Sequence, residues 1–496
     1  MAFTPSKYQK AVFTYIQKGK GNAVIEAVAG SGKSTTLVQA INLIDDSKKV
    51  LFLAFNVDIV AELKKKIGPR NNVEISTLHS LGCKACVRAY HSTVKGDKYG
   101  IYLNDGIASG AISPRSERVR TKREKFSEWK SNIVKLIDLG RVNLALDSVS
   151  LCNLADKHGL WLQDNEVELA QQIIAWGTNH PETIDFTDMI YIPSVKDIRL
   201  FQRDWVFVDE CQDLNAAQRT LFLKTIKPNG GRFVAVGDAK QSIYGFCGAD
   251  EESFYKLTKI PHTAKLPLSI CYRCDANIIR LAQSIVPQIQ WRDGAGDGIV
   301  DREAKVADVK DGDMVLCRVS APLTKLCMHY ISNGVKAYVK GKDMGTNLIN
   351  MIKKTRAKNM DKCFEKLNAE LGKLLGKIMD KKHCNEEEAR ENDQYKIMED
   401  KIMSIQVLSD GLTTCDAVMN RISSIFSDDA KEGICLSTIH KSKGLENDRV
   451  FVLCEDKLFL KAAMRQAWSA QQEYNLVYVM MTRAKHYLGY IQDFTM

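Results

Sequence analysis

Short apolar runs alternate with amphipathic stretches in two separate parts of the chain. Each run is short enough for a buried strand, and apolar residues between the runs recur at helical spacing, as at Leu37, Val38, Ile41 and Ile44. Buried strands that alternate with helices predict parallel sheets covered by helices on both faces, the α/β class. The runs lie at residues 24–25, 50–56, 205–208 and 233–236 in the first part, and at 314–317, 335–339 and 450–453 in the second.

This rhythm is interrupted twice. It disappears between residues 83 and 181, where amphipathic segments predict a mainly helical insertion, and it returns at residues 184–188. A second interruption begins near residue 346, and its apolar stripe predicts a coiled arm or a small helical subdomain. Basic residues in the first interruption form either a binding face for a polyanion or an ordinary solvated helix surface. These residues are Arg115, Arg118, Arg120, Lys122, Arg123 and Lys125, and the stripe consists of Phe364, Leu367, Leu371, Leu374 and Ile378.

Length and composition narrow the class of protein. A chain of 496 residues is too long for one core, and 45% hydrophobic with 26% charged residues is typical of a soluble globular protein. The net charge of +10 suggests a polyanionic partner, although diffuse basicity is weak evidence by itself. We find no apolar signal core and no membrane-spanning segment, so we expect a cytoplasmic protein without a membrane partner.

The fourteen cysteines are scattered through expected core strands, which favours reduced, small apolar side chains. Two Cys-x-x-Cys pairs occur, at Cys83/Cys86 and at Cys271/Cys274. The two pairs lie far apart in the sequence, and each stands beside another motif. A shared zinc site is therefore not expected.

A glycine-rich turn joins the first apolar run to the first helical stretch. Gly30 and Gly32 let the backbone reverse, and the following helix N-terminus presents unpaired N–H groups to an anion. Lys33 adds a positive charge for outer phosphates, and the Ser34 hydroxyl can hold Mg²⁺. The alternative is an ordinary glycine turn, and the motif departs from the phosphate-loop pattern at Ala27. We interpret the turn, Ala29, Gly30, Ser31, Gly32, Lys33, Ser34 and Thr35, as a nucleoside triphosphate site.

Two further strand ends carry chemistry that suits this site. The run at 205–208 is followed by Asp209, a candidate Mg²⁺ ligand, and by Glu210, which could orient or deprotonate the attacking water. The run at 233–236 leads to Gln241, a candidate phosphate sensor. Tyr244 and Phe246 follow closely, so one loop could couple a phosphate contact to base stacking.

Other polar and aromatic residues follow the strand ends of the first part. Open α/β sheets bind ligands at this edge, and a mixture of aromatic, hydroxyl and imidazole groups suits a nucleic-acid strand. Taken singly, an aromatic here is more often core and a histidine more often structural. Upstream, the amide of Gln9 could read adenine, although an exposed glutamine is the ordinary interpretation. The residues at the strand ends are Phe55, Asn56, Thr77, His79 and Ser80.

Taken in order, six motifs resemble the UvrD/Rep-like branch of superfamily 1 helicases. Any one of them could arise by chance, but the ordered series spans nearly the whole chain. The motifs are Ala-Gly-Ser-Gly-Lys-Ser at 29–34, Asp-Glu-Cys-Gln-Asp at 209–213, Gly-Asp-Ala-Lys-Gln-Ser-Ile-Tyr at 237–244, Tyr-Arg at 272–273, Thr-Ile-His-Lys-Ser-Lys-Gly-Leu-Glu at 438–446 and Tyr-Val-Met-Met-Thr-Arg-Ala at 478–484.

The resemblance implies two RecA-like parallel-sheet motor domains with ATP in the cleft between them, each with a mainly helical inserted subdomain. On this template the first motor domain comprises 1–85 and 182–265, with its insertion at 86–181. The second comprises 266–345 and 429–496, with a short insertion at 346–428.

The resemblance also implies roles for individual residues. Gln9 would read adenine, Tyr272 would stack on it, and Glu446 would contact the ribose. Lys33 and Ser34 would bind phosphate and Mg²⁺, with Asp209 as metal ligand, Glu210 as base and Gln241 as γ-phosphate sensor. Arg273 and Arg483 would be arginine fingers. The positions that would grip single-stranded DNA are Phe55, Asn56, Thr77, His79, Tyr244, Phe246, Thr438, His440 and Lys443.

The implied activity is an ATP-dependent DNA helicase or single-stranded DNA translocase that moves 3′ to 5′, with Mg²⁺ as cofactor. We expect a monomer that acts on tailed or forked duplex DNA, with replication or repair proteins as further partners. Alternatives are a translocase that displaces proteins without efficient unwinding and an ATP-gated nucleic-acid binding module. RNA in place of DNA stays open as well. Two positions depart from the family pattern, since Cys271 and Cys247 replace a common Asn and a common Arg.

Overall fold

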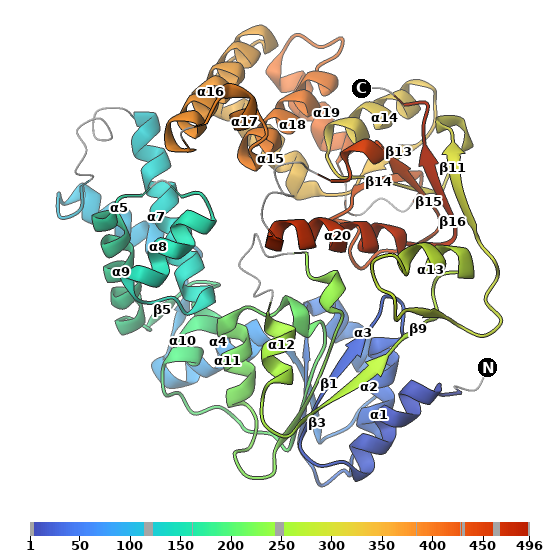
Figure 1. Cartoon of the computed structure of the whole chain (residues 1–496). Coiled ribbons are helices and arrows are strands. Elements are labelled where there is room, and N and C mark those ends of the chain that lie inside the picture. Colours follow the sequence, from blue (N-terminus) through green and yellow to red (C-terminus); the bar gives the residue numbers. More distant parts are fainter. Residues whose placement is uncertain are drawn as a thin grey trace. The chain divides into compact units, whose positions relative to one another are not determined.

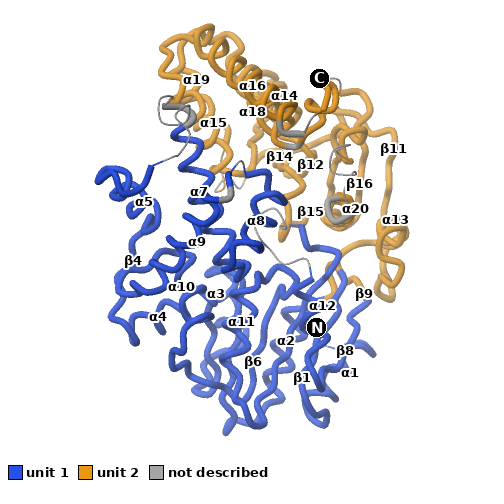
Figure 2. The backbone as a smooth tube through the Cα atoms, turned by 60° about the vertical axis from the view of Figure 1, so that its left-hand side comes forward, with its two compact units in different colours: residues 1–28, 32–269 blue, residues 29–31, 270–496 orange. Residues whose placement is uncertain are grey.

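The computed structural model describes residues 4–113, 123–160, 162–243, 252–382, 384–426, 428, 432–459 and 467–494. The chain divides into two compact units (Figure 2). Unit 1 comprises Met1–Val28 and Gly32–Ser269, and unit 2 comprises Ala29–Ser31 and Ile270–Met496.

Unit 1 is built on a six-stranded, fully parallel sheet with the order β3-β2-β6-β7-β1-β8. Successive residues of its central strands enter two different cores, one on each face of the sheet. Phe52, for example, packs in one core, and its neighbours Leu51 and Leu53 pack in the other. Both faces are covered, which is why these strands read as unbroken apolar runs. The strands are β1 (Asn22–Ala27), β2 (Val50–Ala54), β3 (Val73–Thr77), β6 (Trp205–Val208), β7 (Arg232–Gly237) and β8 (Thr263–Leu268).

Helices cover this sheet and frame the strand ends. The covering helices are α1 (Lys7–Lys18), α2 (Lys33–Asn42), α3 (Val57–Ile67), α11 (Ala216–Lys224) and α12 (Ser253–Thr258), with short 3₁₀ turns η1 (Cys211–Asp213) and η2 (Ala239–Gln241).

A helical insertion separates β3 from β6, as predicted, and most of its helices group together in Figure 1. It has its own apolar core, which includes Leu103, Ile133 and Ile173. The expectation that residues 184–188 rejoin the parallel sheet is wrong. Among the described strands, β5 (Thr183–Ile184) pairs with β4 (Thr93–Val94) and not with the six-stranded sheet, and Asp188 begins a helix. The helices are α4 (Leu78–Tyr90), α5 (Lys98–Ala108), α7 (Arg123–Asn143), α8 (Ser148–Lys157), α9 (Asp164–Asn179) and α10 (Asp188–Val195).

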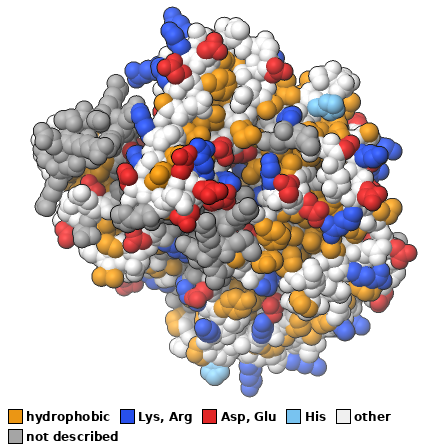
Figure 3. All heavy atoms as spheres, turned by 45° about the horizontal axis from the view of Figure 1, so that its top comes forward, with side chains coloured by type: hydrophobic (Ala, Val, Ile, Leu, Met, Phe, Trp, Pro, Cys, Tyr) orange, Lys and Arg blue, Asp and Glu red, His pale blue; other side chains and the backbone are white. Residues whose placement is uncertain are grey.

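The predicted basic cluster of the insertion cannot be placed. Residues 115, 118, 120 and 122, and the side chains of Arg123 and Lys125, lie outside what the structure describes. On the face of the molecule shown in Figure 3, Lys and Arg are interspersed with Asp and Glu. On that face, therefore, the positive charges do not gather into one field.

Unit 2 contains a second six-stranded parallel sheet, with the order β11-β16-β15-β12-β14-β13. The two sheets and their helical insertions confirm the predicted fold class. The strands are β11 (Ile299–Ala304), β12 (Met314–Cys317), β13 (Ala337–Val339), β14 (Ile434–Thr438), β15 (Asn447–Leu453) and β16 (Ala484–Ile491). Around them lie α13 (Ala276–Ala282), α14 (Ala321–Ser332), α20 (Ala467–Met481) and the paired strands β9 (Ile270–Cys271) and β10 (Gln290–Trp291).

The second insertion lies between β13 and β14 and packs onto the sheet. Leu367 of the predicted stripe belongs to the same core as Val315 and Leu436 of the sheet, so the insertion is not a detached arm. Within the stripe, Leu367 and Ile378 are buried, and Phe364, Leu371 and Leu374 are partly buried. Its helices are α15 (Lys342–Thr355), α16 (Met360–Lys382), α17 (Glu386–Arg390), α18 (Asp393–Leu408) and α19 (Cys415–Ile425).

Asp400 of α18 fastens this insertion to the start of α14. Its two carboxylate oxygens accept hydrogen bonds from the backbone N–H groups of Ser320 and Ala321, each 2.9 Å long, and from the Ser320 hydroxyl. We expect Asp400→Ala to lower the free energy of unfolding by about 1–2 kcal/mol, because it leaves helix N-terminal donors without an acceptor. Urea unfolding measures this, with the exposed Glu370→Ala on α16 as a control that should change little.

None of the cysteines that the structure describes forms a disulfide bond, and most of them are buried. Among the helices of the described ranges, we find none that combines the length and the apolar character needed to cross a membrane.

Candidate functional site

The glycine turn between β1 and α2 has the geometry expected of an anion-binding loop. Gly30 and Gly32 have φ angles of +64° and +74°, in the left-handed region that a side chain would strain. Gly32 is the N-cap of α2, and the first helical hydrogen bond runs from the Thr36 N–H to its carbonyl. The N–H groups of the first turn therefore face the loop, where an anion would accept from them.

Lys33 at the start of α2 contacts the end of β6. Its amine lies 2.8 Å from Oε1 of Glu210, and both side chains are mostly buried. Burial by itself would lower the pKa of Lys33, but the negative charges of Glu210, Asp209 and Asp238 outweigh it and raise the pKa. The amine is therefore charged at neutral pH.

Asp209 and Ser34 present oxygens to each other beside this pair. The Ser34 hydroxyl donates to Oδ2 of Asp209 at 3.3 Å, and the backbone N–H of Glu210 donates to Oδ1 at 2.9 Å. Burial and the neighbouring charge of Glu210 raise the pKa of Asp209, and burial raises that of Asp238 to about 6. Three carboxylates thus surround one lysine. The excess negative charge and the oxygen donors fit a hard divalent cation such as Mg²⁺.

Glu210 is held in an unusual backbone conformation and by a side-chain relay. Its φ is +50°, which is uncommon for a residue with a side chain and is found at functional sites. Nε2 of Gln212 donates to Oε2 of Glu210 at 2.6 Å, and Oε1 of Gln212 accepts from the Asp238 N–H at 3.0 Å. Asp238 in turn accepts from the Gln241 amide at 2.7 Å. Sequence reasoning did not single out Gln212, although it lies within the 209–213 motif.

Gln9 lies against the same loop. Its amide oxygen accepts from the Ser6 N–H at 3.0 Å, and its Nε2 donates to the Thr36 hydroxyl at 3.0 Å. The side chain is buried, so in this structure it joins α1 to α2. Thr35, by contrast, is exposed.

Unit 2 brings together three residues that the sequence places far apart. Nε of Arg273 lies 2.5 Å from Oε2 of Glu446, and its Nη1 donates to the Thr482 carbonyl at 3.0 Å. Arg483 is buried and donates to the carbonyls of Val479 at 2.9 Å and Leu445 at 2.8 Å. Burial and the charge of Arg273 lower the pKa of Arg483 to about 10.

Unit 2 also contains Ala29–Ser31 of the phosphate loop. The Ala29 N–H donates to the Tyr478 hydroxyl at 2.8 Å, and the Gly30 carbonyl accepts from the Tyr272 N–H at 2.8 Å. A Cβ atom on Gly30 would lie only 2.7 Å from Cβ of Arg273. Arg273 therefore lies directly beside Gly30, while the Tyr272 side chain is 40% exposed. Tyr478 was quoted within the last motif but was not predicted as a contact of the loop.

The strand ends of β2 and β3 carry the first part of the predicted nucleic-acid interface. Phe55 is half exposed. Asn56 and Thr77 cap helices, since their side-chain oxygens accept from the N–H groups of Ile59 and Ser80 at 2.9 and 3.1 Å. Capping gives these two residues a structural role whatever else they bind.

The His79 ring lies against Phe186, which sequence reasoning missed. Their ring centroids are 4.5 Å apart, and Phe186 is 65% exposed. Burial lowers the pKa of His79, so its imidazole is neutral at physiological pH. A large exposed aromatic next to a neutral ring is a surface on which a base can stack. In the sequence, Phe186 looked like one more apolar position of an expected strand.

The remaining predicted contacts follow β14. Thr438 is buried at the strand end, and its hydroxyl accepts from the Lys441 N–H at 3.4 Å. Burial and the nearby Arg318 lower the pKa of His440 to about 3, so this imidazole is neutral too. Lys443 is partly exposed. Tyr244 and Phe246 lie outside the described residues.

Comparison with known proteins gives two family matches. The model for the UvrD/REP helicase N-terminal domain matches residues 7–261, and that for the UvrD-like helicase C-terminal domain matches residues 335–492. The chain is 24% identical over 305 residues to the ATP-dependent DNA helicase Rep of Buchnera aphidicola subsp. Baizongia pistaciae, covering 57% of this chain and 42% of that protein. It is 26% identical over 290 residues to the ATP-dependent DNA helicase PcrA of Staphylococcus aureus, covering 55% and 38%. The matched region thus spans about two fifths of these relatives' length.

Proposed function

Because the chain belongs to the UvrD/REP helicase family, we propose that it is an ATP-dependent motor that moves along single-stranded DNA, 3′ to 5′, and unwinds duplex DNA. The observation that carries this proposal is the buried group around the phosphate loop, in which Lys33 contacts Glu210 and Ser34 contacts Asp209. Phosphoryl transfer from ATP requires a positive charge for the phosphates, oxygen ligands for Mg²⁺ and a carboxylate base. Lys33, the pair Ser34 and Asp209, and Glu210 supply these three parts.

The unit 1 residues would act in sequence as ATP binds. The phosphates accept from the N–H groups of the loop, and Lys33 exchanges Glu210 for a phosphate oxygen. Glu210 then accepts a proton from the attacking water while Gln212 holds its second oxygen. Ser34 and Asp209 would hold Mg²⁺, which supplies a Lewis acid for the phosphate oxygens.

The unit 2 residues would complete the chemistry. Arg273 and Arg483 place positive charge where negative charge develops on the transferred phosphoryl group. Glu446 releases Arg273 and contacts the ribose, Tyr272 stacks on the adenine and Gln9 reads its edge. Gln241, through its bond to Asp238, reports whether the γ-phosphate is present.

DNA would lie along the strand ends of the two sheets. Phe55, His79 and Phe186 offer ring faces to the bases of one strand, and Asn56 and Thr77 present helix N-termini to its phosphates. The strand end of β14 contributes Thr438, His440 and Lys443. Because His79 and His440 are neutral, they contribute hydrogen bonds and stacking but no charge.

The test is an ATPase and strand-separation assay on matched substrates. We expect single-stranded DNA to stimulate ATP hydrolysis with a rate that rises with strand length, and we expect unwinding of 3′-tailed but not of 5′-tailed or blunt duplexes. The Lys33→Ala variant, purified by the same procedure, controls for contaminating ATPase. A rate that does not depend on strand length would favour an ATP-gated binding module. If the protein displaced bound proteins but did not unwind duplexes, it would be a translocase and not a helicase. If only RNA stimulated ATP hydrolysis, the substrate would be RNA and not DNA.

A further inference from the structure

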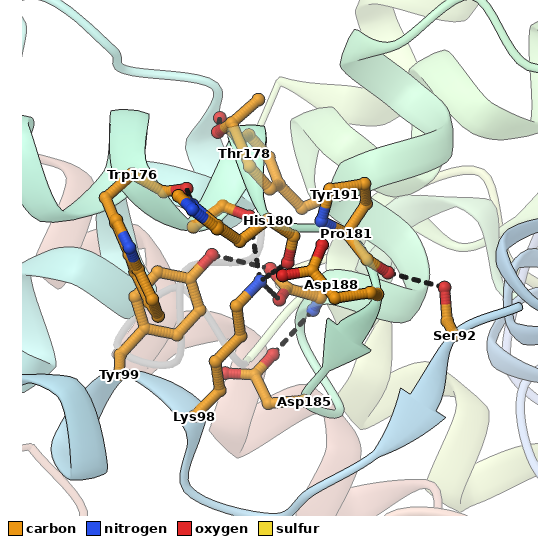
Figure 4. A network of polar contacts seen from close by, with 12 residues as sticks. Ser92, Lys98, Tyr99, Trp176, Thr178, His180, Pro181, Asp185, Asp188 and Tyr191 are labelled. Carbon is orange, nitrogen blue, oxygen red and sulfur yellow. Dashed lines mark hydrogen bonds and ion pairs between the residues drawn. The ribbon is translucent and has the colours of Figure 1, made fainter. Parts of the chain in front are cut away.

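A buried ionic network joins helices α5 and α7 to the turn at residues 185–188, which carries Phe186. Arg141, near the end of α7, donates from Nη1 to Asp185 at 2.8 Å and to Asp188 at 2.7 Å. At the start of α5, Lys98 donates to Oδ2 of Asp188 at 3.0 Å, and the Tyr99 hydroxyl donates at 2.8 Å to Oδ1, the oxygen that also accepts from Arg141 (Figure 4). The two cations and the two aspartates are all buried.

Stability is a weak reason for such a network. Removing ions from water carries a large desolvation penalty, and well-packed apolar residues in the same volume are often as stable or more stable. Charged groups do fix geometry, because each must keep its specific partner. The Arg141 guanidinium binds Asp185 through two parallel hydrogen bonds of 2.8 and 2.9 Å, and this arrangement sets the orientation of the carboxylate.

The network fixes the turn that presents Phe186. The Asp188 N–H donates to Oδ1 of Asp185 at 2.7 Å, which closes the turn, and both carboxylates are held by side chains of α5 and α7. Phe186 lies between these two anchored residues and is exposed, yet its ring lies 4.5 Å from that of His79. An exposed ring that is held in place loses less conformational freedom when a base stacks on it.

We propose that Arg141 is a positioning residue for the nucleic-acid interface: its bonds to Asp185 and Asp188 hold Phe186 against His79, ready to stack on a base. This inference rests on the proposed function. It assigns to helix α7 of the insertion a part in strand binding that requires no contact of α7 itself with DNA.

The test compares Arg141→Lys with Phe186→Ala. Lysine keeps the charge but loses the paired hydrogen bonds. We expect Arg141→Lys to raise the oligonucleotide concentration for half-maximal ATPase by about tenfold, within the range for loss of one base–aromatic stack. The rate without DNA and the rate at saturating DNA should not change. Arg88→Lys is the matched control, since Arg88 packs on the ring of Phe201 as Arg141 packs on that of Tyr99, but Arg88 donates its hydrogen bond to the Arg199 carbonyl.

A double variant separates positioning from general destabilisation. If Arg141 acts through Phe186, adding Arg141→Lys to Phe186→Ala should cause no further loss of DNA affinity. The inference would be overturned if the losses of DNA affinity in the two single variants multiplied in the double variant. It would also be overturned if Arg141→Lys had unchanged DNA affinity. If Arg141→Lys does not fold, Asp185→Asn replaces it with the same expected results. Wild-type protein that DNA does not stimulate would instead refute the proposed function.

Discussion

Glu210→Gln is expected to abolish DNA-stimulated ATP hydrolysis while nucleotide binding persists. An amide cannot accept the proton that the attacking water must lose, and loss of a general base lowers turnover by about 10²–10⁴-fold. Shape is conserved, because a glutamine oxygen can still accept from Gln212. The substitution also removes the ion pair between Lys33 and Glu210, so the lysine is available to phosphate and ATP affinity should be unchanged or higher.

Single-turnover hydrolysis with saturating single-stranded DNA measures the chemical step, and a fluorescent ATP analogue measures binding. The matched control is Glu62→Gln, which removes a carboxylate from the exposed side of α3. If Glu210→Gln kept more than about a tenth of the wild-type turnover, the fall in rate would be far smaller than the loss of a general base causes. Another group would then accept the proton of the attacking water. Loss of ATP binding would show instead that Glu210 supports the loop through Lys33.

How far the sequence could predict the fold depended on burial. The strands at 50–54, 205–208 and 314–317 are covered on both faces, so every residue is apolar and the pattern is unambiguous. The edge strands β8 and β11 were missed because they carry Pro267 or a charged run and are only partly buried. The stripe of α16 predicted an apolar face, but nothing local could say that its residues join the core of the unit 2 sheet.

The candidate site divides in the same way. Parallel strands end at one edge, so the approach of Lys33, Asp209 and Asp238 could be predicted from where the apolar runs end. Contacts that depend on tertiary packing could not. Phe186 and Arg141 are far apart along the chain. No local pattern indicates that Arg141 of α7 bonds Asp185, the residue before Phe186.

Arg273→Ala is expected to slow ATP hydrolysis by about 10³–10⁵-fold, the range for loss of an arginine finger, with little change in ATP affinity. Arg273 lies beside Gly30 of the phosphate loop, and its guanidinium is held by Glu446, a partner that a phosphate can replace. Arg483 is less informative to mutate, because its guanidinium satisfies buried carbonyls of Val479 and Leu445, so its loss would also disturb folding.

Steady-state kinetics with saturating DNA measures this effect as a fall in kcat at nearly constant KM. Arg273→Lys should restore only part of the rate, because an ammonium keeps the charge but lacks the planar fork. Arg280→Ala, on neighbouring α13, serves as the matched control, since its guanidinium bonds Asn277 and stacks on Trp291. A raised KM with normal kcat would mean that Arg273 binds the nucleotide equally in ground and transition states. An unchanged enzyme would remove Arg273 from the chemistry and leave its ion pair with Glu446 as a structural contact.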